Sequence, residues 1–239
     1  MLILLGAGVN AAEESLWLPT RPPFWNNNSF VPFLILEPER SIRLQQVFDS
    51  DEFSSHAPLG AWITEIAFAV DTRSGPFFGA TLNDVQVNLS TTLREPDGLD
   101  PVFANNIGGD EITVYGRGPL TLPGSLMLHV VEFHTPFFFD PGQGNLLLDI
   151  WNYEGYVSDP TTRPQYFAHI EMGDSVSSVV GINADDAVGF AATGGVATRF
   201  TFTPVPEPSS VVLASLGVLI LTVVSIKRLM RKDLRHVPL

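Results

Sequence analysis

Short runs rich in apolar residues, several of which alternate with polar residues, occupy the chain before residue 209. Successive side chains of a strand point to opposite faces, so an alternating run predicts a strand with one buried face. Gly, Pro, Asn and Asp residues separate the runs. The predicted strands are 41–48, 60–70, 84–90, 111–115, 126–133, 145–151, 166–170, 176–181, 188–192 and 197–203.

Two of the runs also predict which side chains face the core. In the first, Ile42 and Leu44 alternate with Arg43 and Gln45, which predicts a half-buried strand. In the second, residues of one parity are expected to share the core face. They are Trp62, Ile66, Phe68 and Val70.

The strand pattern determines the expected fold class. No window before residue 209 carries a helical apolar stripe longer than two turns. About ten short strands with frequent turns predict an all-β fold, an antiparallel β-sandwich or jelly roll, over 39–203. Two longer loops, 97–109 and 153–163, interrupt the strands, and loops of this kind often carry binding sites.

The first 38 residues do not follow the alternating pattern. The apolar stretch in 1–12 ends in small residues, which predicts the remnant of a signal peptide whose true start lies upstream, or else a short buried strand. Residues 13–38 hold five prolines, which exclude a helix. We expect an extended arm whose Trp and Phe side chains pack onto the domain.

The pattern changes again after residue 203. Alternating prolines in 204–208 favour a stiff extended spacer. The next eighteen residues, 209–226, carry no charge, and eleven of them are Val, Leu or Ile. As a helix they would span about 27 Å, close to the roughly 30 Å hydrocarbon core of a bilayer. Because buried core helices rarely lack charge on every side, we expect one C-terminal transmembrane helix.

Basic residues crowd the tail 227–239, namely Lys227, Arg228, Arg231, Lys232 and Arg235. Lys and Arg beside a membrane span favour the cytoplasmic side. The tail therefore predicts a cytoplasmic C-terminus and a main domain outside the cytoplasm.

Pro206, Glu207 and Pro208 precede the apolar span and the Arg-rich terminus in that order. This arrangement resembles the PEP-CTERM sorting signal of Gram-negative and related bacteria. The resemblance implies recognition by exosortase, a membrane processing enzyme, and association with extracellular polysaccharide. It implies a cell-envelope location, with the processed protein either retained there or released to the surface or matrix.

A second resemblance covers the middle of the chain. Residues 84–92, 96–99, 103–111, 135–137 and 145–149 are similar to a β-rich domain that recurs among such exported proteins. That domain has no assigned chemistry, so the resemblance implies fold and location alone.

Charge and cysteine content exclude several classes of function. Residues 1–208 hold eight basic and twenty-five acidic residues, a net charge of −17, while 209–239 hold five basic and one acidic residue, a net charge of +4. An acidic domain repels nucleic-acid phosphates, so we expect no nucleic-acid partner. The chain has no Cys, which excludes disulfides, thiolate metal sites and cysteine nucleophiles.

Candidate chemistry is limited to acidic and aromatic residues. Asp97, Asp100, Asp110 and Glu111 surround a loop rich in Gly and Asn, and such oxygen ligands suit Ca²⁺, although plain turn-forming Asp is the alternative. No EF-hand spacing is present. The five His residues show no metal-binding spacing either, and His129 and His134 should lie on opposite strand faces.

Aromatic residues flank the second loop. Trp151, Tyr153 and Tyr156 could stack on sugars, or else pack in the core and rim. We expect a non-enzymatic exported domain without a cofactor or catalytic residues. The alternative is a glycan hydrolase or lyase that uses paired carboxylates such as Asp149, Glu154 or Asp159.

Overall fold

The computed structural model describes residues 11–20, 27–29, 33, 41–74, 79–124, 127–154, 165–206 and 220. The chain divides into two compact units, 1–205 and 206–239. In the second unit only Pro206 and Ile220 are described, so nearly all of the predicted span 209–226 and the whole basic tail lie outside the described residues. Among the described residues, no helix has the length and apolar character needed to cross a membrane.

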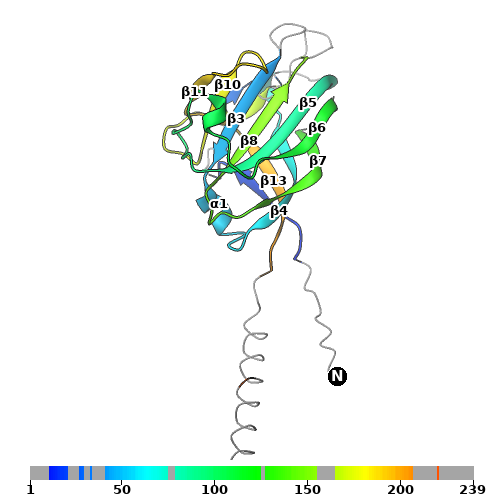
Figure 1. The fold of residues 1–239 in the computed structure, drawn as a ribbon. Coiled ribbons are helices and arrows are strands. Elements are labelled where there is room, and N and C mark those ends of the chain that lie inside the picture. Colours follow the sequence, from blue (N-terminus) through cyan, green and yellow to red (C-terminus); the bar gives the residue numbers. More distant parts are fainter. Residues whose placement is uncertain are drawn as a thin grey trace, which may run out of the picture. The chain divides into compact units, whose positions relative to one another are not determined.

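The first unit is all-β, with antiparallel strand pairing throughout its described sheets (Figure 1). A four-stranded sheet has the order β1 (Glu14–Leu18), β13 (Thr198–Pro204), β4 (Ala61–Ala69) and β7 (Leu128–Phe139). A six-stranded sheet has the order β11 (Phe190–Ala192), β10 (Val176–Gly181), β3 (Ile42–Phe48), β8 (Asn145–Asn152), β5 (Gly79–Thr92) and β6 (Ile112–Pro123). A small third sheet joins β12 (Gly195–Val196), β9 (Tyr166–His169) and β2 (Asn27–Ser29).

The main core lies between the inward faces of the four- and six-stranded sheets. One cluster of buried side chains includes residues of both, such as Ile66 and Phe200 from the first and Phe48 and Leu148 from the second. The rings of Phe48 and Phe200 meet edge to face at 4.8 Å. Phe53, on the short helix α1 (Ser50–Ser54), packs against Phe200 from beyond the end of β3.

The prediction of an all-β fold is confirmed, and several strand positions agree closely. The predicted strand 176–181 coincides with β10, and 145–151 falls one residue short of β8. The sequence pattern did not predict β2, β12 or α1. The arm 13–38 contains β1, an edge strand that pairs with β13 and buries Leu16 and Leu18.

The expected core face of β4 was partly wrong. Trp62 is 50% exposed, whereas its neighbour Ile63 is fully buried. A register shift between Ile63 and Glu65 leaves Thr64 without a partner in the pairing with β7 and β13. Such a bulge adds one residue to the strand and exchanges its two faces. The core-facing residues are therefore odd-numbered before the bulge and even-numbered after it. Phe68 and Val70 are buried as expected.

The prediction of a half-buried β3 was also wrong. Leu44 is buried in the core, but Gln45 on the opposite face is buried as well. The outer face of the six-stranded sheet is covered by another part of the chain, and that covered face is the most elaborate polar site among the described residues.

Candidate functional site

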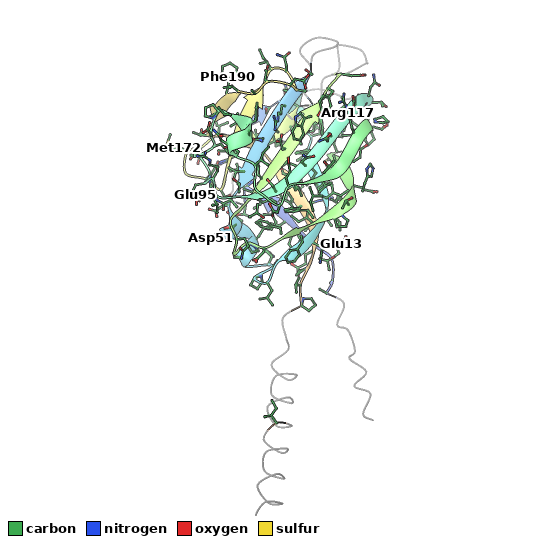
Figure 2. The ribbon with its side chains drawn as sticks, in the orientation of Figure 1. Glu13, Asp51, Glu95, Arg117, Met172 and Phe190 are labelled. Carbon is green, nitrogen blue, oxygen red and sulfur yellow. The ribbon has the colours of Figure 1, made fainter. Side chains whose placement is uncertain are left out.

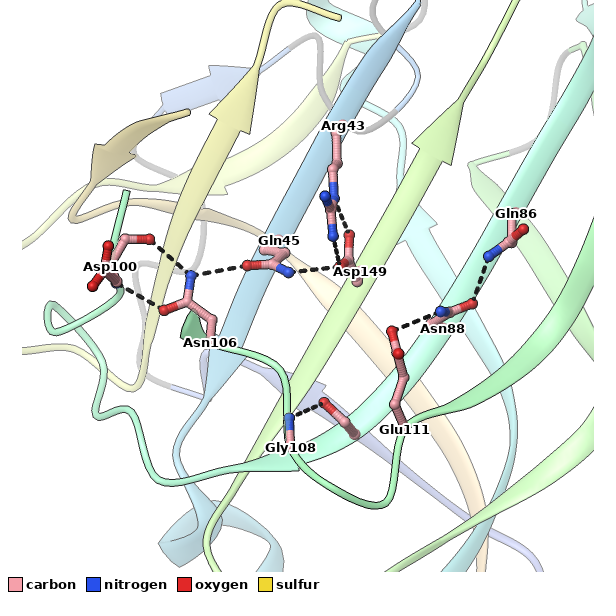
Figure 3. A network of polar contacts seen from close by, with 10 residues as sticks. Arg43, Gln45, Gln86, Asn88, Asp100, Asn106, Gly108, Glu111 and Asp149 are labelled. Carbon is pink, nitrogen blue, oxygen red and sulfur yellow. Dashed lines mark hydrogen bonds and ion pairs between the residues drawn. The ribbon is translucent and has the colours of Figure 1, made fainter. Parts of the chain in front are cut away.

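Polar side chains form cross-strand rows on the outer face of the six-stranded sheet (Figure 3). The register sets Gln45 on β3 opposite Asp149 on β8, and Asp149 opposite Asn88 on β5. The adjacent row contains Arg43 and Trp151. Their sequence neighbours point into the core, so strand alternation directs all these side chains outward.

Asp149 is the centre of this face. Its carboxylate accepts hydrogen bonds from Arg43 Nε at 3.0 Å, Arg43 Nη2 at 2.7 Å and Gln45 Nε2 at 2.6 Å. The residue is only 2% exposed. Burial raises the pKa of Asp149 to about 6, although the hydrogen bonds from Arg43 act in the opposite direction. The guanidinium of Arg43 lies between the rings of Phe103 and Trp151, at 4.4 and 4.3 Å from their centroids.

The segment between β5 and β6, residues 93–111, covers this face, and we call it the cover segment. Its Asn106 donates hydrogen bonds to Gln45 Oε1 at 2.9 Å and to the Asp100 carbonyl at 2.8 Å. The Asn106 side-chain oxygen accepts from the Asp100 N–H. These bonds satisfy the buried amides and fix the cover segment to β3.

Phe103 anchors the cover segment through apolar contact. It belongs to a second buried cluster with Val47, Leu147 and Val179 of the sheet. A Cβ at Gly189 would lie 2.7 Å from the Phe103 ring, so the loop after β10 also closes tightly on it. The predicted ligand loop 97–109 is therefore a packed covering layer of the sheet.

The structure does not bring the four calcium candidates together. Each carboxylate accepts hydrogen bonds from protein donors: Gly173 N–H to Asp97, Val102 N–H and the Asn105 amide to Asp100, Thr91 N–H and hydroxyl to Asp110, and the Asn88 amide to Glu111. Among the described residues, no three His, Asp or Glu side chains are arranged to hold a metal ion. Through these hydrogen bonds, the four carboxylates connect turns and strands of the domain.

The two described aromatic candidates already have cationic partners. One face of Trp151 is occupied by Arg43, and the Arg117 guanidinium lies 3.8 Å from the ring centroid of Tyr153. Arg117 is in turn paired with Asp84. Tyr156 lies outside the described residues.

The carboxylates suggested for glycan chemistry do not form a described pair. Asp149 is buried against Arg43 and Gln45, so its carboxylate does not face an open cleft. Glu154 is exposed, and Asp159 lies outside the described residues.

An open groove of about 860 Å³ lies between the end of β5, the cover segment and the connection from β7 to β8. Its lining residues are Thr91, Thr92, Leu93, Arg94, Asn105, Asn106, Ile107, Gly108, Gly109, Asp110, Phe138, Asp140 and Gln143. Five of them lie in the predicted ligand loop 97–109, and Asp110 is the one that the sequence analysis named as a candidate ligand. The charged groups are largely engaged within the chain, since Asp110 binds Thr91 and Arg94 Nε donates to the Asn105 carbonyl.

Both ring nitrogens of the buried His129 have hydrogen-bond partners. His129 is fully buried, with Nδ1 2.7 Å from the Tyr166 hydroxyl and Nε2 3.2 Å from the Pro123 carbonyl. A carbonyl only accepts, so Nε2 carries the proton and Nδ1 accepts from Tyr166. Burial lowers the pKa of His129 to about 4. His134 is exposed, which confirms that it and His129 lie on opposite faces of β7.

The outer face of the four-stranded sheet has no comparable polar network among the described residues. Its ion pair, Arg199 with Glu65 at 2.8 Å, keeps about a quarter of each side chain exposed. At one end of this face, Trp62 and Phe138 are opposite each other in the register and 50% and 38% exposed.

No protein-family model matches the chain, and no curated protein matches it in sequence. The two resemblances drawn from the sequence therefore stay predictions.

Proposed function

We propose that the chain is an exported, non-enzymatic envelope protein whose domain has a β-sandwich or jelly-roll fold and is displayed outside the cytoplasm. Delivery depends on the C-terminal sorting signal. Pro206, Glu207 and Pro208 bind an exosortase-type enzyme, residues 209–226 form a transmembrane helix, and the basic tail holds the C-terminus in the cytoplasm before processing.

One observation carries the proposal. The motif, the uncharged stretch and the basic cluster follow one another in 34 residues of sequence, 206–239. The boundary between the compact units falls after Val205, directly before the motif. An enzyme that acts at the motif would thus reach a segment outside the folded sheets.

A display role suits the described domain better than catalysis does. Of the two described glycan-chemistry candidates, Asp149 is buried and engaged by Arg43 and Gln45, and none of the described contacts favours the hydrolase or lyase alternative. Extracellular polysaccharide is the matrix component with which we expect the displayed domain to associate.

The test is fractionation of the native host followed by mass spectrometry of the mature C-terminus. Processing predicts a product that ends near 206–208 and lacks the tail. A Glu207→Ala variant should accumulate unprocessed at the membrane, while Asp84→Ala, a change within the sheet, should be processed normally. A chain that ends at Leu239 in every fraction would contradict sorting by an exosortase.

A further inference from the structure

Three exposed apolar side chains gather at the end of the domain where β13 finishes. Leu59, Trp62 and Phe138 are 45%, 50% and 38% exposed, and we call them the exit patch. The rings of Trp62 and Phe138 lie 5.2 Å apart. A Cβ at Gly60 would lie 2.7 Å from the Phe138 ring, so this ring packs on the turn that carries Leu59. Leu59 directly precedes Gly60, so all three exposed side chains lie at the same end of the sheet.

The chain leaves the domain beside this patch. Thr203 pairs with Trp62 across β13 and β4, and the Val205 N–H donates to the Gly60 carbonyl at 2.8 Å. Val205 is the last residue of the first compact unit. The exit of the chain is thus fixed to the same turn as the patch.

The distance to the predicted membrane span is short. Four residue steps separate Val205 from Ser209, the first residue of the uncharged stretch. A fully extended chain covers at most about 14 Å in four steps. When 209–226 lies in a bilayer, Val205, which is hydrogen-bonded to the turn that carries the patch, is held within about that distance of the place where the chain enters the bilayer.

We propose that the exit patch seats on the outer surface of the bilayer, with Trp62 at the boundary between headgroups and acyl chains. This inference rests on the proposed function, because it requires the span to be in the membrane. Trp is enriched at this boundary, where its ring is buried and its N–H stays hydrated. Apolar side chains that cluster on the surface beside a membrane tether are more stable against the membrane interface than in contact with water.

The net charge of the domain determines which lipid headgroups it can approach. Residues 1–208 carry a net charge of −17, which anionic headgroups repel. The patch itself contributes no charge. We therefore expect contact with zwitterionic lipid, and contact with anionic lipid only when salt screens the repulsion.

The absence of cysteine allows a site-specific test on the full chain. Leu59→Cys and, as a matched control, Phe190→Cys are each labelled with an environment-sensitive fluorophore and reconstituted in phosphatidylcholine vesicles. Phe190 is 71% exposed. Figure 2 shows it at the opposite end of the domain from Glu13, and Glu13 adjoins Glu14, which pairs with Phe202 near the end of β13. Quenching by nitroxide-bearing lipid and by neutral acrylamide is compared at the two positions.

The label at position 59 should be quenched by the lipid-borne nitroxide and protected from acrylamide, and the label at position 190 should show the reverse. Adding Trp62→Ser and Phe138→Ser should remove most of the lipid quenching at 59. Phosphatidylglycerol vesicles at low salt should weaken it, and added salt should restore it.

Two results would overturn the proposal while leaving the anchor intact. Equal acrylamide access at both positions would show that the patch faces water. Protection at position 59 from both quenchers, with label-to-label distances that indicate dimers, would assign the patch to a second copy of the chain. If the unlabelled full chain failed to float with the vesicles, the result would contradict the proposed transmembrane span. The inference about the exit patch, which depends on that span, would then be contradicted as well.

Discussion

The two large sheets differ in what lies on their outer faces. The six-stranded sheet carries charged and amide side chains there, and the cover segment buries them in a closed network around Asp149. The four-stranded sheet leaves about a quarter of each side chain of its outer ion pair exposed, and it exposes Trp62 and Phe138 more strongly. Every buried polar group needs a hydrogen-bond partner, because burial removes it from water. Apolar side chains on an open face can instead contact another molecule or a membrane.

The difference assigns separate roles to the two faces. The covered face stabilises the domain, because breaking one of its bonds would leave a buried polar group unpaired. The open face keeps its outer side chains partly exposed, so they contribute less to stability. This face ends beside the chain's exit at Val205, where exposed side chains are available for an interface. The following predictions test this contrast, from the largest expected effect to the smallest.

Asp149→Ala should destabilise the domain by about 3–5 kcal/mol, because Arg43 would keep a buried charge without its partner. The matched variant on the open face is Glu65→Ala, which breaks the more exposed pair with Arg199 and should cost less, about 1–2 kcal/mol. Urea unfolding of both variants measures the difference. Equal losses would show that the two faces do not differ as described.

Phe103→Ala should destabilise the domain by about 3 kcal/mol, since it leaves a cavity beneath the cover segment. It should also speed proteolytic cleavage within 93–111, because the anchor of that segment is lost. Phe190→Ala, at a residue that is 71% exposed, is the control and should change the unfolding free energy by less than about 0.5 kcal/mol. Unchanged proteolysis in Phe103→Ala would mean that hydrogen bonds alone hold the cover segment.

Stability should depend on pH through Asp149. Its folded-state pKa of about 6 lies above the ordinary value of about 3.9, so the folded domain binds this proton more tightly than the unfolded chain. The favourable contribution is complete below about pH 4 and is lost as the pH rises through about 6, a change of about 2–3 kcal/mol. His129 acts oppositely, because its lowered pKa contributes stability above about pH 6.5 that is lost as the pH falls through about 4.

The two effects are separated by comparing the wild type with Asp149→Asn from pH 4 to 7. The difference in unfolding free energy between them isolates the Asp149 contribution and should change across this range. A difference that stays constant with pH would contradict the raised pKa.

The smallest effect should come from the exit patch. Trp62→Ser changes a half-exposed side chain on the open face and should alter the unfolding free energy of the domain by less than about 0.5 kcal/mol. Thermal unfolding in detergent-free and vesicle-bound preparations would measure this. A loss of unfolding free energy comparable with that of Phe103→Ala would show that Trp62 stabilises the domain as a core residue does.

The turn residues that bound the short apolar runs were sufficient to locate strands whose pairing is regular, and they placed β8 and β10 almost to the residue. The assignment of side chains to faces failed for Trp62, since the irregular pairing at Thr64 depends on the partner strands and leaves no mark in the local pattern. The short helix α1 did leave a signal in Asp49, which caps it.

The candidate site was harder to predict, because its geometry comes from residues far apart in the chain. Asn106 and Gln45 are 61 positions apart, and Arg43 and Asp149 are 106 apart. A polar residue on a strand normally indicates a solvent-facing side, so Gln45 was assigned to the wrong environment. Phe103, within a segment otherwise typical of a loop, was the sequence signal that this segment packs on the sheet.

The most direct test of the account is the location of the domain in living cells. Met172 is 80% exposed, and the chain has no Cys, so Met172→Cys provides one accessible thiol. Spheroplasts of the native host that express this variant are treated with a membrane-impermeant maleimide before and after lysis. We predict full labelling before lysis, because the domain lies outside the cytoplasm. Labelling that appears only after lysis would contradict the proposed export and display.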